Sequence, residues 1–226
     1  MDILDENALD PDFGDRFERG RRPDCQLYLI SPPNLDLDFP ERLARAFDGG
    51  AVAAFQLRLK GMDDHAIAAL AEPLQKLCSD RDVAFIINDS ISLAKRLGAD
   101  GVHLGQGDGD PREARDILGR DAQIGVTCHN SRHLAMEAGE AGADYIAFGA
   151  FHQSGTKLVE YIADTTLLEW WTTISGVPCV AIGGITVENA PPIIAAGADF
   201  IAVSGAVWEA VGREGEAVAQ FVALMA

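Results

Sequence analysis

Two cations and an amide follow one apolar run in a pattern that suits an anionic ligand. The run at 52–58 leads into Gln56-Leu57-Arg58-Leu59-Lys60, and in a strand the side chains of Gln56, Arg58 and Lys60 share one face. Directed into the mouth of a barrel, these groups would be costly without an anion to pair with. The alternative is that Arg58 and Lys60 pair with carboxylates of the core, and spacing alone does not separate the two.

Two carboxylates stand at the ends of the next two apolar runs. Asp89 follows the run at 84–88, and Asp108 closes His103-Leu104-Gly105-Gln106-Gly107-Asp108 after the run at 101–104. Carboxylates on adjacent loops, close to Arg58 and Lys60, suit a Mg²⁺ ion that also holds phosphate oxygens. The sequence therefore predicts a magnesium site.

Helix capping is the structural alternative for these carboxylates. Asp89 precedes a helix expected to start near Ser90, where an N-cap is common. Asp110 is a rival metal ligand, but it precedes Pro111 and is typical of an N-cap. The pairing of Asp89 with Asp108 beside a basic strand end favours the metal site for those two.

The later strand ends carry hydroxyls, glycines and one lysine. Thr127 is a candidate hydrogen-bond partner for a substrate, whereas the adjacent Cys128 and His129 point apart and have no orienting third group, which argues against thiol catalysis. The loop at 151–157 ends in Lys157 and is expected to act as a mobile phosphate-contacting lid, with an ordinary surface loop as the alternative. Glycines after the last two strands suit a phosphate cradled by backbone N–H groups.

The elements that must position these residues alternate along the chain. Apolar runs predict eight strands, at 26–30, 52–58, 84–88, 101–104, 123–126, 145–148, 179–182 and 200–203. Helical patterns lie between them at 39–47, 64–78, 91–97, 111–118, 131–141, 164–174 and 187–196. Eight strand-helix units predict a single (β/α)8 TIM barrel over residues 24–226. An open doubly wound sheet is the alternative, although the segment after the first strand lacks GxGxxG.

A weak internal repeat supports the barrel. Gly-Ala-Asp occurs at 98–100, 142–144 and 197–199, each time between a helical pattern and an apolar run. A glycine just past a helix accepts a positive φ and ends the helix sharply. We therefore expect one repeated loop at the N-terminal face of the barrel.

Charge and composition limit the partners. The formal net charge is −17, and no cluster of Lys and Arg predicts nucleic-acid binding. Residues 1–23 form an acidic extension without a signal-peptide core, and no apolar run is long enough to span a bilayer. The four cysteines are widely spaced and read as buried free thiols. A cytoplasmic location is expected, and the sequence leaves a homo-oligomer open.

The motifs at consecutive strand ends resemble those of the thiamine phosphate synthase family over about residues 25–210. The matched motifs are Gln56-x-Arg58-x-Lys60, Asn88-Asp89, His103 through Asp108, the loop Ser154-Gly155-Thr156-Lys157, and Gly183-Gly184-Ile185. The resemblance implies an enzyme that joins a pyrimidine pyrophosphate to a thiazole phosphate and releases pyrophosphate. It also implies that Mg²⁺ is bound by Asp89 and Asp108.

The resemblance also implies roles for the other residues. Arg58, Lys60 and Lys157 would neutralise the leaving pyrophosphate as catalytic groups. The pyrimidine pyrophosphate would contact Gln56, Arg58, Lys60, Asn88 and Lys157. Thr127 would take the place of a family serine near the pyrimidine amine, and His103 is a further substrate-binding residue. The thiazole phosphate would contact Ser154, Thr156, Gly184, Ser204 and Gly205.

Departures from the family pattern fall mainly on the thiazole side. Ser154 replaces a threonine, Gln153 replaces a proline, and Ser204 is displaced by one position. Two alternatives therefore stay open. One is a thiazole tautomerase, a relative on the same fold, and the other is a non-catalytic paralogue that binds thiamine precursors.

Overall fold

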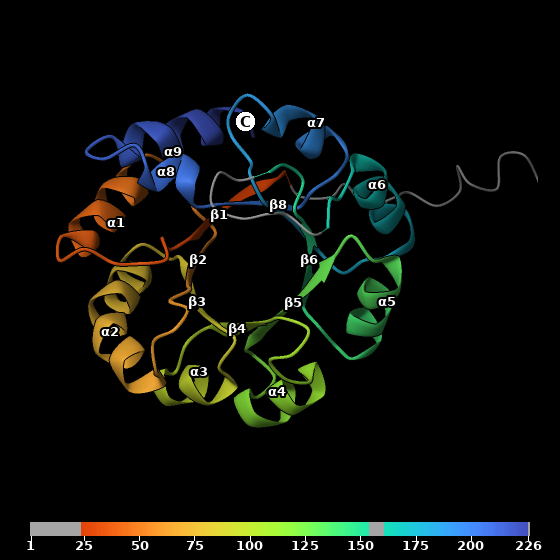
Figure 1. Cartoon of the computed structure of the whole chain (residues 1–226), viewed down its shortest axis with the longest axis horizontal. Coiled ribbons are helices and arrows are strands. Elements are labelled where there is room, and N and C mark those ends of the chain that lie inside the picture. Colours follow the sequence, from red (N-terminus) through yellow and green to blue (C-terminus); the bar gives the residue numbers. More distant parts are fainter. Residues whose placement is uncertain (1–23, 154–160, 226) are drawn as a thin grey trace, which may run out of the picture.

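A computed structural model of the chain describes residues 24–153 and 161–225. The acidic extension 1–23 and the predicted site residues Ser154, Thr156 and Lys157 lie outside the described residues. Eight parallel strands close into a barrel in chain order, and β1 pairs with β8 to complete it (Figure 1). The predicted (β/α)8 barrel is thus confirmed, and the open-sheet alternative is wrong.

Helices form a ring around the strands, as Figure 1 shows. The strands are β1 (Gln26–Ile30), β2 (Ala54–Leu57), β3 (Ala84–Asn88), β4 (Gly101–Leu104), β5 (Gln123–His129), β6 (Tyr145–Gly149), β7 (Cys179–Ile182) and β8 (Phe200–Val203). The helices are α1 (Phe39–Asp48), α2 (Asp64–Asp80), α3 (Ile91–Leu97), α4 (Pro111–Leu118), α5 (Arg132–Glu140), α6 (Thr165–Ile174), α7 (Ala190–Ala195), α8 (Gly205–Trp208) and α9 (Glu214–Ala223).

Four elements differ from the expectations. β2 ends at Leu57, before the basic residues, whereas β5 continues past its apolar stretch to His129 with a register shift between Thr127 and His129. Helices α8 and α9 were not predicted, and neither begins with a side-chain cap hydrogen bond that the sequence would reveal. The short helix α8 follows β8 directly, at a position where TIM barrels often carry an extra helix.

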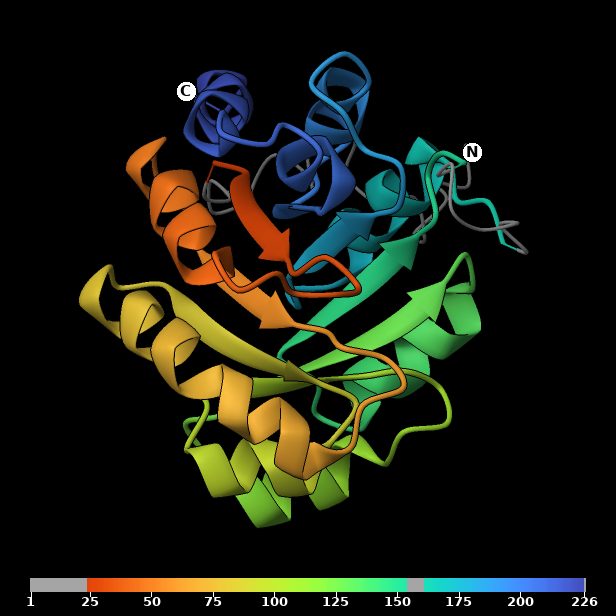
Figure 2. The same ribbon diagram turned by 60° about the vertical axis from the view of Figure 1, so that its left-hand side comes forward.

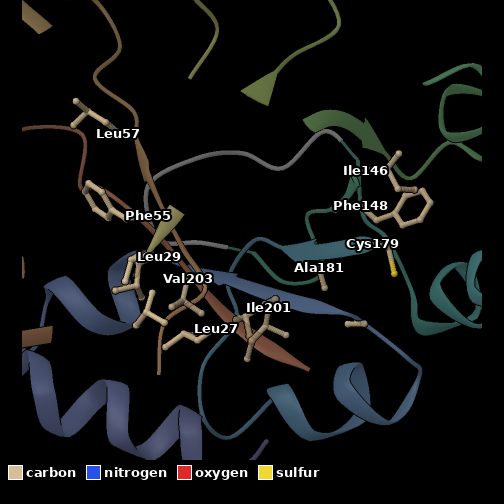
Figure 3. Packing of buried hydrophobic residues seen from close by; sticks show 14 of the residues in the cluster. Leu27, Leu29, Phe55, Leu57, Ile146, Phe148, Cys179, Ala181, Ile201 and Val203 are labelled. Atoms are coloured by element: carbon tan, nitrogen blue, oxygen red, sulfur yellow. The ribbon is translucent and has the colours of Figure 1, made fainter. Parts of the chain in front are cut away.

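Alternation along the strands creates two apolar layers. The outward side chains pack under the helices, and Figure 3 shows this layer at Leu27, Leu29, Ile201 and Val203. The inward layer is smaller and contains Tyr28, Ile30, Ala54, Ile86, Tyr145, Ala147, Val180 and Ala202. Leu57 and Leu59 both belong to the outward layer, so alternation continues beyond the end of β2 and leaves Gln56 and Arg58 on the other side.

The Gly-Ala-Asp repeat has one structural role at all three positions. Gly98, Gly142 and Gly197 end helices with φ values of 60°, 86° and 96°. The aspartates that follow, at 100, 144 and 199, each accept a hydrogen bond from the first or second backbone N–H of the preceding strand, at 2.7 to 2.8 Å. The repeat therefore ties each helix end to the neighbouring strand at the face opposite the site.

A buried ion pair closes the barrel's outer ring between its first and last helices. Glu214 of α9 is fully buried and accepts hydrogen bonds from Arg42 Nε at 2.7 Å and Arg45 Nε at 3.0 Å, both from α1. Burial alone raises the pKa of Glu214, but the hydrogen bonds from Arg45 and Arg42 outweigh it and lower the pKa to about 2. The two ends of the described chain are therefore joined by charge-assisted contacts.

The strand arrows in Figure 2 point toward the same end of the barrel, so their C-terminal ends gather the candidate site residues. Within the described ranges, no helix is both long enough and apolar enough to cross a membrane. Three of the four cysteines are buried free thiols as predicted, while Cys25 is only partly buried.

Candidate active site

The carboxylate Asp89 is presented by a tight turn at the end of β3. Its φ is 66°, a left-handed conformation that aspartate tolerates better than most residues. The Asp89 N–H continues the ladder to the His103 carbonyl at 2.8 Å, and the Ser90 N–H turns back to the Asn88 carbonyl at 2.8 Å. This three-residue turn carries the Asp89 side chain clear of the strand.

Asp89 is not a helix cap. The N-cap of α3 is Ser90, whose hydroxyl accepts from the Leu93 N–H at 3.1 Å. The capping alternative for Asp89 is therefore wrong, because the turn places the adjacent serine in that position. Asp110 does cap α4, as predicted, by accepting from the Arg112 N–H at 2.7 Å.

Asp108 meets Asp89 from the loop after β4. Its Oδ2 accepts from the Gly105 N–H at 3.0 Å, and a Cβ at position 105 would lie only 2.5 Å from that oxygen. Glycine is thus required for the loop to hold Asp108 in this position. Burial, together with the hydrogen bond and the negative charge of Asp108, raises the pKa of Asp89.

Cations border this carboxylate pair. Lys60 Nζ lies 3.9 Å from Asp89 Oδ2, and the positive charges of Lys60 and Arg58 partly offset the rise in the pKa of Asp89. Arg58 makes no ion pair with any carboxylate of residues 24–153 or 161–225. The described part of the chain thus gives no support to the core-pairing alternative for Arg58.

The pair has the character of a divalent-cation site with few protein ligands. Asp108 raises the pKa of Asp89 in part by repulsion, and a divalent cation between the two carboxylates removes that repulsion. The described residues contain no group of three or more His, Cys, Asp or Glu side chains that could enclose a metal. Carboxylate oxygens such as those of this pair are the kind of ligand that Mg²⁺ prefers, with waters or phosphate oxygens filling the rest of its shell.

Below the carboxylates, a chain of hydrogen bonds crosses the barrel interior. Gln56 Nε2 donates to the Tyr28 hydroxyl at 3.0 Å, and the Tyr28 and Tyr145 hydroxyls lie 3.0 Å apart. His103 Nδ1 is 3.1 Å from the Tyr145 hydroxyl, and His103 Nε2 is 2.8 Å from Thr127 Oγ1. Five strands thus contribute one side chain each to a continuous chain, which we call the interior chain.

Burial fixes the protonation of the interior chain. It lowers the pKa of His103 to about 4, with a further contribution from the positive charge of Arg58, so the ring is neutral near pH 7. Burial also raises the pKa of Tyr28 to about 12 and that of Tyr145 well above its usual value. The members are therefore neutral donors and acceptors.

Thr127 is only partly buried, whereas Tyr145 on the next strand is buried. Thr127 is therefore the end of the interior chain that lies nearest the mouth of the barrel. The neighbouring Cys128 is fully buried on the outward side, and burial raises its pKa to about 12. A thiol in that environment stays protonated, which agrees with the prediction that it is not a nucleophile.

Glycines shape the opposite side of the mouth, after β7. Gly183 and Gly184 have φ values of 102° and 63°, and a Cβ at Gly184 would lie 2.8 Å from the His152 carbonyl oxygen. The His152 N–H donates to the Gly183 carbonyl at 3.0 Å, and Asn189 Nδ2 donates to the Gly184 carbonyl at 2.9 Å. This backbone is held rigidly in a conformation that side chains would prevent.

Ser204 and Gly205 follow β8 and begin α8. The Ser204 hydroxyl donates to the Ser31 carbonyl at 3.2 Å, while the Ser31 hydroxyl lies 2.8 Å from the backbone nitrogen of Arg58 and accepts from it. The buried Ser31 thus connects the glycine-rich side of the mouth to the basic strand end.

The structure brings most predicted residues to one end of the barrel. Gln56, His103 and Thr127 share the interior chain, and Asn88 is the register partner of His103. Sequence reasoning missed Tyr28, Tyr145 and Ser31. A signal existed for the two tyrosines, because a tyrosine inside an apolar strand needs a partner for its hydroxyl when buried.

Comparison with known proteins assigns the family. A family model described as thiamine monophosphate synthase matches residues 27–207. The chain is 64% identical over 200 residues to thiamine-phosphate synthase of Erythrobacter litoralis, a match that covers 87% of this chain and 93% of that protein. It is 56% identical over 203 residues to thiamine-phosphate synthase of Rhodospirillum centenum, covering 89% and 98%.

A solved structure agrees with this match. Thiamine phosphate pyrophosphorylase from Pyrococcus furiosus superposes with a TM-score of 0.79 at 29% identity, over 90% of this chain and 96% of that one. The chain belongs to the thiamine monophosphate synthase family.

Proposed function

We propose that the chain is a thiamine-phosphate synthase, which joins a pyrimidine pyrophosphate to a thiazole phosphate and releases pyrophosphate. The family match carries the activity, and the observation that carries the site is the carboxylate pair Asp89–Asp108 beside Lys60 and Arg58. A protein with a net charge of −17 needs local positive charge to bind two phosphorylated substrates, and this end of the barrel supplies it.

The pyrophosphate site is assigned to the basic residues and the metal. Arg58 and Lys60 bind the pyrophosphate oxygens, and Lys157 joins them from outside the described residues. Asp89 and Asp108 would hold Mg²⁺, which would supply further positive charge to the leaving pyrophosphate. The raised pKa of Asp89 supports this assignment, because a cation between the two carboxylates would relieve the repulsion that contributes to it.

The pyrimidine lies over the interior chain in this proposal. Gln56, Asn88, His103 and Thr127 surround it with amide, imidazole and hydroxyl groups that are neutral near pH 7. Neutral groups suit a substrate that develops positive charge at its methylene carbon, because a protonated His103 would oppose that charge. The low pKa of His103 supports this reading.

The thiazole phosphate is assigned to the glycine-rich side. Gly184, Ser204 and Gly205 would bind its phosphate through backbone N–H groups and a hydroxyl, with Ser154 and Thr156 added from outside the described residues. The positive φ of Gly184 and its close approach to His152 support a backbone-lined site there.

The reaction these residues favour is dissociative. The bond between the pyrimidine methylene carbon and the pyrophosphate oxygen breaks, and its electron pair leaves with the pyrophosphate. The amino group of the pyrimidine stabilises the resulting cation, and the thiazole nitrogen then donates its lone pair to the methylene carbon. Protein groups supply positioning and charge and form no covalent bond.

The test is product analysis with purified full-length protein, Mg²⁺ and both substrates. Thiamine phosphate and pyrophosphate should form in equal amounts, and neither should form when one substrate is omitted. Isomerisation of a thiazole precursor without pyrophosphate release would identify a tautomerase instead. Binding of both substrates without any turnover would identify the non-catalytic alternative.

A further inference from the structure

The hydrogen bonds of the interior chain all run in one direction from donor to acceptor, and the atom types at its start determine that direction. Gln56 Nε2 is a donor, so the Tyr28 oxygen accepts from it. The single Tyr28 hydrogen then has the Tyr145 oxygen as its partner at 3.0 Å. In the reverse direction, Tyr28 would accept from both Gln56 and Tyr145 and leave its own buried hydrogen unpaired, which is costly.

The same direction of hydrogen-bond donation continues through His103 to the mouth of the barrel. Because Tyr145 accepts from Tyr28, its hydrogen goes to His103 Nδ1. The neutral ring then carries its proton on Nε2, from which it donates to Thr127 Oγ1 at 2.8 Å. Thr127 is left with a free O–H hydrogen at the partly exposed end of the chain.

Space for this arrangement is built into β5. A Cβ on Gly125 would lie 2.0 Å from the ring carbon Cζ of Tyr145 and 2.4 Å from its hydroxyl oxygen. The glycine therefore admits the Tyr145 ring to the barrel axis, where it stacks on His103 with ring centroids 5.6 Å apart. Both the ring contact and the hydroxyl contact hold the imidazole in one orientation.

We propose that Tyr28 and Tyr145 are positioning residues that orient the Thr127 hydroxyl as a donor to a ring nitrogen of the aminopyrimidine. This inference rests on the proposed function, because that function supplies the aminopyrimidine. The ring nitrogens are the acceptors of such a ring, whereas its amino group is a donor. A donor to the ring already binds the substrate in the ground state, and this bond weakens as the ring becomes cationic, so loss of the donor raises KM without lowering kcat.

The first test is the tautomer of His103 in the full-length wild-type protein labelled with ¹⁵N-histidine. The ring nitrogen signals, assigned by comparison with His103→Gln, should show a proton on Nε2 and an unprotonated Nδ1 that accepts a hydrogen bond. A proton on Nδ1 would mean that the hydrogen bonds of the interior chain run in the opposite direction, and it would overturn the proposal.

The second test uses Tyr145→Phe, with Tyr161→Phe as the matched control. Tyr161 stacks on His129 and lies outside the interior chain. Tyr145→Phe should change the His103 nitrogen signals and raise KM for the pyrimidine pyrophosphate about tenfold, with kcat within about twofold. Tyr161→Phe should change neither.

A double substitution separates positioning from general loss of stability. Thr127→Val should raise KM as Tyr145→Phe does, and adding Tyr145→Phe to Thr127→Val should have little further effect, since Tyr145 acts through Thr127. Fully additive effects would contradict the proposal. If the wild-type protein makes no thiamine phosphate, both the proposed function and this inference are wrong. If the wild type is active and Tyr145→Phe has the same KM as the wild type, only this inference is wrong.

Discussion

The carboxyl groups of Asp89 and Asp108 lie within hydrogen-bonding reach of each other, although they follow different strands. Each is held by backbone, Asp89 by its positive-φ turn and Asp108 by the Gly105 N–H. Two carboxylates fixed in this way repel each other unless a proton or a cation lies between them. The first two predictions follow from this pair.

Divalent metal should stabilise the wild-type protein through this pair. Mg²⁺ should raise Tm in a concentration-dependent way, and EDTA should reverse the change, because a ligand that binds only the folded state stabilises it. Asp108→Asn should abolish this shift, whereas Asp116→Asn, a control on exposed α4 surface, should retain it. A shift of the same size in Asp108→Asn would place the metal elsewhere.

The same pair should make the metal-free protein sensitive to pH. The pKa of Asp89 is raised in the folded state, so the folded protein binds a proton more tightly than the unfolded chain does. Its contribution to stability is therefore present below the unfolded pKa and is lost as pH rises through the folded pKa. In EDTA, Asp89→Asn should melt at a higher temperature than wild type at pH 7, and the difference should shrink toward pH 4. Equal melting curves at both pH values would contradict the raised pKa.

Arg58→Ala should impair turnover without unfolding the barrel. Loss of one cation from the pyrophosphate site should cost about 3 kcal/mol of leaving-group stabilisation, or roughly a hundredfold in rate. Tm should be unchanged or higher, since unliganded cations repel one another. A loss of about 3–5 kcal/mol in the free energy of unfolding would instead show a structural ion pair.

The ion pairs between α1 and α9 should contribute to stability alone. Glu214→Gln removes the buried charge that pairs with Arg42 and Arg45 and leaves Arg42 with the exposed Asp36 as its ion-pair partner, so it should lower the free energy of unfolding by about 3 kcal/mol. The folded fraction should keep its kcat. Glu216→Gln, exposed on the same helix, is the control and should change stability by no more than about 0.5 kcal/mol.

This contact should also fail in acid. The folded pKa of Glu214 is about 2, below its usual value of 4.5, so the stability it contributes is present above pH 4.5 and is lost as pH falls toward 2. Acid unfolding of the wild type should therefore be steeper in that window than that of Glu214→Gln. Parallel acid-unfolding curves would show that the pair contributes nothing there.

Gly125→Ala should disturb the interior chain. The added methyl would collide with the Tyr145 ring, so the substitution should cost about 1–3 kcal/mol of stability as overpacking does. Two measurements check this prediction. Urea titration gives the free energy of unfolding, which should fall, and steady-state kinetics give KM for the pyrimidine pyrophosphate, which should rise. Gly119→Ala, at a position with open space around its Cβ but a φ of 93°, tests strain without the collision and should leave KM unchanged.

Local signals in the sequence were sufficient for most of the barrel. Apolar runs located all eight strands, and the Gly-Ala-Asp repeat located three helix ends, because a glycine with positive φ is a local device for ending a helix. Helices α8 and α9 were not predicted. Neither starts with a capping side chain or a proline in its first turn, and both contact the distant Arg42.

The positions of the candidate site residues were predictable in part. The residues at strand ends were identifiable from alternation and charge, since parallel strands bring those ends together. The interior chain was not, because Tyr28 and Tyr145 are 117 positions apart and meet only when the barrel closes. The same holds for Ser31, whose contacts with Arg58 and Ser204 join β1 to both of its neighbours.

The central claim is that the strand-end cluster around Asp89 and Asp108 releases pyrophosphate in step with formation of thiamine phosphate. Its most direct measurement is parallel quantification of both products from wild type and Asp108→Asn, in the presence of Mg²⁺ and both substrates. Wild type should make the two products in equal amounts, and the folded variant should lose both at least about a hundredfold. Undiminished synthesis in Asp108→Asn, or pyrophosphate release without thiamine phosphate in the wild type, would contradict the account.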